Sequence, residues 1–177
     1  MSPILDDLLE GNARFVANGW DPKDRELPSP PAKGLAIVAC MDTRYNVERV
    51  LGLEHGDAKV IRNAGNHVDD GTLRSLIVAV HLLGVTEIVI MGHTKCGMTT
   101  VGRGEFRIAK SIASRSAVPL HEVMRPDFQR WLGGIPDVED HVRESVSRLR
   151  AHPFMPKDIR VHGLIYDNDT GRVKPLH

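Results

Sequence analysis

The stretch EIVIMGHTKC, residues 87–96, joins a short apolar run to a histidine and a cysteine. The run is rich in β-branched residues and shows little alternation of polar and apolar side chains, which is typical of a strand buried on both faces. Similar runs occur in LAIVAC (35–40), AKVIR (58–62) and IRVHGLIY (159–166). Because helical patterns separate these runs, the sequence predicts an α/β fold with a central, mostly parallel β-sheet of four to five strands flanked by helices.

The N-terminal part differs from this core. Apolar residues recur at helical spacing over residues 3–17, which predicts an amphipathic helix. Residues 21–34 contain four prolines and no periodicity, so we expect an extended arm that carries the helix away from the core. We expect one domain over residues 1–177, made of an N-terminal helix and proline-rich arm (1–34) and an α/β core (35–177).

Several core segments carry helix and turn signals. Residues 73–83 are apolar nearly all round, so we expect this helix to be buried on most faces. Residues 137–150 place aliphatic side chains on one stripe behind Asp137, a suitable N-cap. Residues 103–135 predict a mixture of helix and loop, and residues 166–173 predict a turn before a short edge strand.

The overall composition argues against several classes of protein. The 177 residues hold 23 Lys and Arg against 23 Asp and Glu, so no positive field attracts nucleic acid or an anionic membrane. The first residues lack the basic start of a targeting peptide, and no apolar run is long enough to span a bilayer. With two cysteines in all, we expect a cytoplasmic protein that keeps its thiols for metal binding or catalysis.

Both cysteines lie at the C-terminal ends of predicted strands. Cys40 ends the first strand, and His93 and Cys96 follow the third. In open α/β sheets, ligands bind in the crevice beyond the carboxyl ends of the strands, so we expect these three side chains to meet there. Two sulfurs and one imidazole with the fourth position open are typical of a catalytic zinc site, since structural zinc sites use four protein ligands.

Two oppositely charged residues, Asp42 and Arg44, lie two and four positions after Cys40. The carboxylate of Asp42 can reach the open coordination position or accept a hydrogen bond from a bound water. Arg44 can hold that carboxylate through paired hydrogen bonds, which lowers its pKa and fixes its direction.

Each of these residues also has a simpler interpretation. A single buried cysteine such as Cys40 is often a small apolar core residue. Cys40 and Cys96 could form a disulfide, although a reducing compartment disfavours one. Asp42 and Arg44 could be a surface ion pair of little energetic value. The metal site is favoured because all these residues are predicted to meet at one edge of the sheet.

Three segments together resemble the β-class carbonic anhydrase family. CMDTR (40–44), HTKCG (93–97) and VIRNAGN (60–66) are similar to that family's C-x-D-x-R, H-x-x-C-G and R-N-A-G patterns. The resemblance runs over most of the chain and is weakest over residues 103–135. The length, and the lack of a glutamine just before the first strand, resemble the shorter, non-plant-type branch of the family.

The resemblance implies roles for the site residues. It implies one Zn²⁺ per chain, held by Cys40, His93 and Cys96. It implies that Asp42 and Arg44 form a catalytic dyad, and that Asp42 can become a fourth zinc ligand in a closed, inactive form. It also implies a homodimer, or a higher oligomer built from dimers, in which N-terminal helices lie across the partner subunit.

Four residues depart from the family pattern or are left without a role by it. Met98 and Asn66 stand where relatives often have glycine, and Asn is among the residues that tolerate a positive φ. Lys95 lies between two predicted ligands, and we expect it to point to solvent rather than act on a bound water or anion. His67 is the nearest candidate for a proton shuttle, and we expect it to face solvent as well.

The leading functional hypothesis is the zinc-dependent reversible hydration of carbon dioxide to bicarbonate, a lyase reaction. Zinc would lower the pKa of its bound water toward neutrality, and the resulting hydroxide would attack the carbon while Asp42 orients it. A second hypothesis keeps the site and changes the substrate to carbonyl sulfide or carbon disulfide. A third is a catalytically silent zinc-binding homologue, which the intact pair of Asp42 and Arg44 disfavours. A fourth is an unrelated α/β domain that binds an anion, and no G-x-G-x-x-G or P-loop supports a nucleotide.

Overall fold

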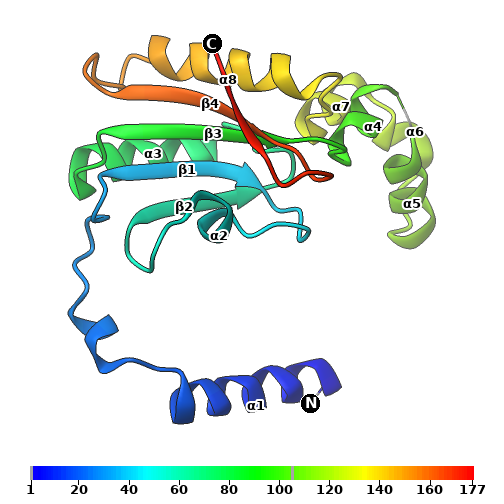
Figure 1. Cartoon of the computed structure of the whole chain (residues 1–177). Helices are drawn as coiled ribbons and strands as arrows, with labels where there is room; N and C mark the ends of the chain where they lie inside the picture. Colours follow the sequence, from blue (N-terminus) through cyan, green and yellow to red (C-terminus); the bar gives the residue numbers. More distant parts are fainter. Residues whose placement is uncertain (1, 105) are drawn as a thin grey trace.

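The structure, a computed structural model, describes residues 2–104 and 106–177. Met1 and Glu105, which belong to the predicted arm and to the segment 103–135, lie outside the described residues. Over the described residues, five strands form one sheet in the order β2-β1-β3-β4-β5 (Figure 1). The strands are β1 (Leu35–Cys40), β2 (Ala58–Asn63), β3 (Glu87–His93), β4 (Arg160–Tyr166) and β5 (Val173–Leu176).

The first four strands are parallel and β5 is antiparallel to β4, so the predicted α/β fold is confirmed. The register aligns the C-terminal ends of the central strands: Ala39 of β1 lies opposite Met91 of β3, and Cys40 lies opposite Asn63 of β2. Cys40 and His93 therefore end neighbouring strands at the same edge of the sheet.

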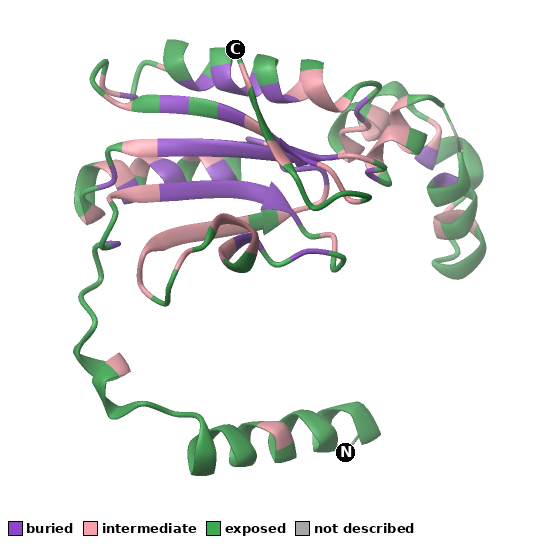
Figure 2. Ribbon diagram, viewed as in Figure 1, coloured by how far each residue is buried: buried purple, intermediate pink, exposed green. Residues whose placement is uncertain are grey.

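Helices cover the two faces of the sheet unequally. On one face, α3 (Asp70–Leu83) and α8 (Val138–Ala151) pack on the aliphatic side chains of β1, β3 and β4. On the other face, the short α2 (Val47–Leu51) packs with Tyr45 and Tyr166. The central strands are consequently buried along most of their length (Figure 2).

The helix α3 is less buried than its sequence predicts. Only Thr72, Leu76 and Ala79 are buried, while Val78 and Leu82 are 45% and 75% exposed. The expectation that this helix is buried on most faces is wrong, because the sheet covers a single stripe of it.

Two glycines let α8 lie close to the sheet. A Cβ atom on Gly92 of β3 would lie 2.7 Å from Val138 Cγ1 and 2.9 Å from Val142 Cγ2. A Cβ atom on Gly163 of β4 would lie 2.9 Å from Val142 Cγ1. The start of α8 is therefore fixed against the strand that ends in His93. The Asp137 side chain accepts a hydrogen bond from the Asp140 backbone N–H, which confirms the predicted N-cap.

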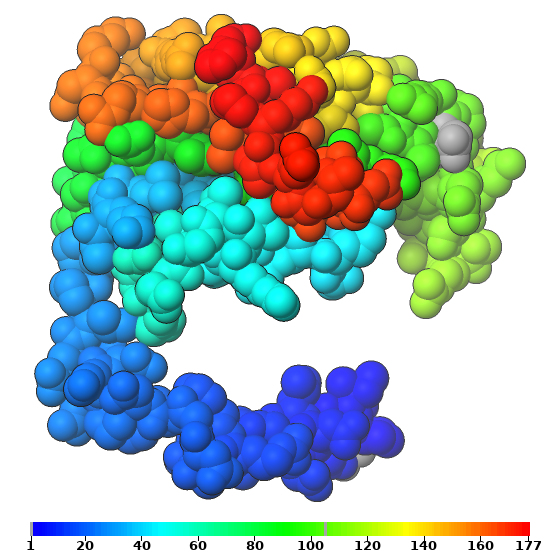
Figure 3. All heavy atoms as spheres, in the orientation of Figure 1, coloured from blue at the N-terminus to red at the C-terminus, as the bar shows by residue number. Residues whose placement is uncertain are grey.

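The N-terminal helix stands apart from the core. The helix α1 (Pro3–Asn18) has no buried residue, and Ile4, Leu8 and Val16 are each at least 60% exposed. In the space-filling view it is joined to the core by the arm alone (Figure 3). The arm is extended as predicted, except for one 3₁₀ helix at Pro22–Glu26.

The segment that the sequence left least defined contains short helices. They are α4 (Met98–Gly102), α5 (Arg107–Arg115), α6 (Leu120–Val123) and α7 (Pro126–Leu132), and they continue from the end of β3 toward α8. Within the part of the chain that the structure describes, no helix combines the length and apolar character needed to cross a membrane.

Candidate metal centre

Three predicted ligands meet beyond the C-terminal ends of β1 and β3. The Cys40 and Cys96 sulfurs and a ring nitrogen of His93 all lie within 4.8 Å of one another. Their residues are 6%, 3% and 0% exposed, respectively. Both cysteines are free thiols, so the disulfide alternative is not what the structure shows.

Apolar residues seal the inner side of this cluster. Ile135, Met98 and Val138 pack against the two cysteines. Val138 is the first residue of α8, the helix that packs closely on Gly92 of β3. The same helix therefore forms the inner wall of the site. A dry wall of this kind strengthens electrostatic interactions between the groups inside it.

The pKa values of the two thiols are shifted in opposite directions. A hydrogen bond from the Cys96 thiol lowers the pKa of Cys40, assisted by the Gly65 backbone N–H, which lies 3.4 Å from the Cys40 sulfur. The nearby Cys40 and burial raise the pKa of Cys96. The first proton leaves the pair readily, and the second leaves when a cation compensates the charge, which suits a divalent metal.

The imidazole of His93 offers one nitrogen to the cluster. Its Nε2 is buried and has no hydrogen-bond partner among the residues that the structure describes. Its Nδ1 lies 2.9 Å from the Thr94 carbonyl oxygen and 2.9 Å from the Asn168 side-chain nitrogen. An Nδ1–H donated to the Thr94 carbonyl leaves the Nε2 lone pair free for a metal. The unpartnered Nε2 and the two free thiols thus fit a zinc ion held by Cys40, His93 and Cys96.

Asp42 lies beside the cluster and is held by Arg44. The Arg44 Nη2 donates to Asp42 Oδ2 at 2.6 Å, and Nε donates to Oδ1 at 2.9 Å. These hydrogen bonds lower the pKa of Asp42 to about 2. Oδ2 is also 3.8 Å from the unpartnered Nε2 of His93. Asp42 is therefore a fixed anion next to the three ligands, with both carboxylate oxygens engaged by Arg44.

Arg62 holds the segment that carries Cys40 and Asp42. Its Nε donates to the Cys40 carbonyl at 2.9 Å, and its Nη2 donates to the Asp42 carbonyl. Arg62 stands in the RNAGN segment, and its role could not be predicted from the sequence, since its partners are backbone oxygens after a neighbouring strand.

The turn between β4 and β5 also supports the site, and sequence reasoning missed it. Asn168 donates to the Thr94 carbonyl at 2.6 Å in addition to its contact with His93. Lys95 is 62% exposed at its side chain and pairs with Asp169 at 2.7 Å, so the expectation that it points to solvent is confirmed. No pattern within the sequence indicates that this turn reaches the loop after β3.

Two residues of the RNAGN loop and its flank behave differently. Asn66 has a φ of 50°, a left-handed conformation that asparagine tolerates. His67 is half-buried, and its Nε2 lies 2.5 Å from the Gly133 carbonyl oxygen. Its ring also packs 4.5 Å from that of His141. The expectation of a solvent-facing histidine is therefore wrong, because His67 links the RNAGN loop to the segment before α8.

A cavity of about 490 Å³ leads to the cluster from solvent. Its lining includes Cys40, Asp42, Arg44 and Cys96, and its apolar part comes from Met41, Ala64 and Met98. The metal cluster and the acid–base pair are thus reached through one mostly apolar opening.

Comparison with known proteins agrees with this geometry. Residues 35–173 match the family described as Carbonic anhydrase. Beta-carbonic anhydrase 1 of Mycobacterium tuberculosis is 37% identical over 173 residues, covering 98% of this chain and 98% of that protein. The chain belongs to the β-carbonic anhydrase family. This β-carbonic anhydrase also matches a solved structure over its full length. The carbonic anhydrase of Streptococcus mutans shares 36% identity and a TM-score of 0.81, covering 100% of this chain and 99% of that one.

Some relatives of this β-carbonic anhydrase carry another name. A carbon disulfide hydrolase of Acidithiobacillus thiooxidans is 30% identical over 185 residues, covering 98% of this chain and 89% of that protein. Family membership alone therefore leaves more than one linear substrate to consider.

Proposed function

We propose that this protein is a zinc-dependent carbonic anhydrase that interconverts carbon dioxide and bicarbonate, with Cys40, His93 and Cys96 as the ligands of one Zn²⁺ per chain. The observation that carries the proposal is the buried trio of two free thiols and an unpartnered imidazole nitrogen within 4.8 Å of one another. When bound there, zinc would lower the pKa of a coordinated water and so supply the nucleophile near neutral pH.

Asp42 and Arg44 form the catalytic pair in this proposal. Arg44 keeps Asp42 ionised and fixes its carboxylate at 3.8 Å from His93 Nε2, beside the position that the three ligands surround. From there Asp42 can accept a hydrogen bond from the attacking water, orient its lone pair toward carbon and take part in moving its proton. If Asp42 separates from Arg44, the same carboxylate is close enough to act as a fourth ligand.

The apolar part of the opening suits a small, uncharged, linear substrate. Met41, Ala64 and Met98 offer no hydrogen bond to carbon dioxide, so discrimination rests on size and on the reacting group. Carbon disulfide is the second candidate substrate, because relatives at about 30% identity over most of the chain are named carbon disulfide hydrolases.

We also propose that the active protein is a dimer, or a higher oligomer built from dimers. The apolar side of α1, including Ile4, Leu8 and Val16, is exposed at the end of the proline-rich arm. A second copy of the chain would bury this face, which a monomer leaves in water at a cost of roughly 25 cal/mol per Å² of apolar surface. We propose residues 35–177 as the α/β core and 1–34 as the dimerisation arm. Two free thiols suit a reducing compartment such as the cytoplasm.

Paired substrate measurements test the proposal. Carbon dioxide hydration and carbon disulfide hydrolysis are measured on one zinc-loaded preparation, with Asp42→Asn and, as a matched control, Asp158→Asn at an exposed carboxylate before the N-terminal end of β4. We expect rapid hydration of carbon dioxide, a loss of roughly 100-fold or more in kcat/KM for Asp42→Asn, and no change for Asp158→Asn. Turnover of carbon disulfide without turnover of carbon dioxide would favour the second candidate.

A further inference from the structure

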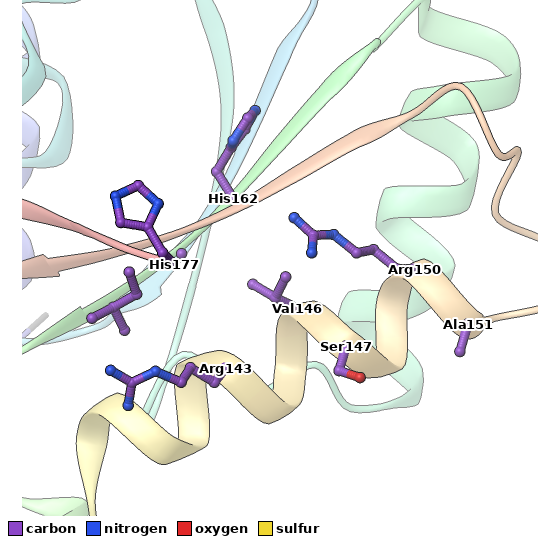
Figure 4. Close-up of a pocket in the computed structure, with 9 residues that line it drawn as sticks. Arg143, Val146, Ser147, Arg150, Ala151, His162 and His177 are labelled. Atoms are coloured by element: carbon purple, nitrogen blue, oxygen red, sulfur yellow. The ribbon is translucent and has the colours of Figure 1, made fainter.

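A second cavity lies at the outer edge of the sheet, apart from the metal centre. It has a volume of about 580 Å³ and lies between the C-terminal half of α8 and the strands β4 and β5 (Figure 4). The pairing of β5 with β4 stops at Gly163, so β5 gives residues 160–162 no strand partner on that side. The cavity forms where β5 ends and α8 continues.

The lining of this cavity is basic although the whole chain is balanced in charge. It contains Arg143, Arg150, His162 and His177, and among the described residues no aspartate or glutamate lines it. The His162 Nε2 lies 3.0 Å from Glu87 Oε2, so the cationic character of the lining comes from the two arginines. Figure 4 shows Arg150 extending from α8 toward the strand that carries His162, whereas Arg143 extends from the same helix on the side of His177. Guanidinium groups present paired N–H donors that match a carboxylate or a phosphate.

The two arginines differ in how far they are already engaged. Arg143 forms ion pairs with Glu139 and Asp140, at 3.1 and 3.4 Å. The Arg150 Nη2 donates to the Val161 carbonyl at 2.5 Å, and Arg150 forms no ion pair with any residue that the structure describes. The backbone contact fixes the guanidinium of Arg150 and leaves its charge without a carboxylate.

The remaining lining is mostly apolar, with Ser147 as its polar member. Val146, Ala151 and Leu176 contribute to it, and Gly163 has no side chain to fill the space. A volume of this size lies within the range of about 300–1,000 Å³ that is usual for small-molecule sites. A ligand that fits the cavity would place an anionic group at the arginines and a small apolar body against Val146 and Leu176.

We infer that this cavity binds a small organic anion, in which a carboxylate or phosphate on a compact apolar body contacts Arg150, with Arg143 at the other end of the cavity. This site is separate from the metal centre, and its occupancy does not depend on the function proposed for that centre. The class of ligand follows from the excess of basic groups, the unpaired guanidinium of Arg150 and the apolar floor.

The test is a titration of zinc-loaded, ¹⁵N-labelled protein followed by amide chemical shifts. Benzoate and phenyl phosphate are the two probes, which distinguish a carboxylate from a phosphate source, and benzyl alcohol is the uncharged analogue. The variants are Arg150→Gln, Arg143→Gln and Arg150→Lys. The matched control is Arg148→Gln, because Arg148 is an exposed arginine of the same helix that does not line the cavity.

We expect saturable shifts at Ser147, Gly163 and Leu176 with at least one anion, and no comparable shifts with benzyl alcohol. Loss of a charge-assisted hydrogen bond in Arg150→Gln should weaken binding about tenfold or more. Arg150→Lys should fall between this variant and the wild type, and Arg148→Gln should bind as the wild type does. The spectrum of each variant without ligand shows whether it has folded.

Other results would overturn the inference. They are shifts confined to the metal centre, shifts that do not saturate in the millimolar range, equal weakening by Arg148→Gln, or equally tight binding of benzyl alcohol. Binding of one anion alone would support the inference and identify the source.

Discussion

Replacement of Gly92 by alanine should destabilise the core and disturb the metal centre from within. The new methyl group would lie 2.7 Å from Val138 Cγ1, 2.9 Å from Val142 Cγ2 and 3.1 Å from Ile165 Cδ1. These neighbours are β-branched side chains packed between α8 and the sheet, so they cannot rotate away freely. Overpacking of a core costs about 1–3 kcal/mol, and the loss of glycine's extra backbone entropy offsets roughly 0.5–1 kcal/mol. We expect a net loss of about 1–2 kcal/mol, a measurable part of a typical stability of about 5–15 kcal/mol.

Urea unfolding at a fixed free zinc concentration measures this loss, since bound zinc stabilises the folded state by mass action. Gly71→Ala in α3 is the matched control. A Cβ atom there meets only Asp69 Oδ1, at an ordinary 3.5 Å, and alanine favours the helix by up to about 1 kcal/mol. The two substitutions are chemically identical and should change the free energy of unfolding in opposite directions.

A double-mutant cycle then tests the mechanism. Val138→Ala removes the methyl group nearest to the new Cβ, so it should be less destabilising in the Gly92→Ala background than in the wild type. We expect a coupling of about 1 kcal/mol, within the range seen for residues in contact. Unfolding of Gly92→Ala at the same urea concentration as the wild type, or simple additivity of the two substitutions, would contradict this reasoning. Either result would show that the close packing of α8 on β3 does not require glycine at position 92.

Three further predictions follow from single contacts. Asn168→Ala removes the donor that holds the Thr94 carbonyl, which accepts from His93 Nδ1, and should weaken zinc binding roughly 10- to 100-fold in a chelator competition. An unchanged affinity would mean that the Thr94 carbonyl orients the ring without Asn168. Asp137→Ala removes the N-cap of α8 and should lower the free energy of unfolding by about 1 kcal/mol in urea, whereas no loss would show that packing alone sets the start of the helix. Burial, assisted by the nearby His67, lowers the pKa of His141 to about 4. As the pH falls below about 6.5, His141 therefore takes up a proton in the unfolded chain before it does so in the folded protein. The wild type should lose stability toward pH 4, and His141→Gln should lose less. At this partly exposed site we expect the difference between the two proteins to be on the order of 1 kcal/mol. Equal slopes of unfolding free energy against pH for the two proteins would contradict this.

The fold and the centre of the site were predictable because their signals are local. Each strand is a short apolar run, and parallel strands necessarily bring their carboxyl ends to one edge of the sheet. The positions of Cys40 and His93 at the ends of two such runs therefore predict that they lie together. Asp42 and Arg44 needed only their spacing of two residues, since a carboxylate and a guanidinium at that distance can pair within one turn.

The supporting residues were not predictable, because their contacts depend on tertiary structure. Asn168 reaches His93 across 75 positions of sequence, and the turn that carries it resembles any other turn. His67 was expected in solvent because its partner, Gly133, lies in a segment without periodicity. Val78 and Leu82 look like core residues in sequence, and they are exposed because the sheet covers one stripe of α3.

The most direct test of the central claim is a zinc titration followed by stopped-flow hydration of carbon dioxide at pH about 8.5, well above the usual carboxylate pKa values. Zinc-free protein is compared with the same protein after stepwise addition of zinc, beside Cys96→Ser. We predict no hydration without zinc, a rate that rises until one zinc is bound per chain, and a large loss of zinc affinity in the variant. Tight zinc binding that leaves carbon dioxide hydration at the uncatalysed rate, or hydration that survives the loss of Cys96 and its zinc, would contradict the account.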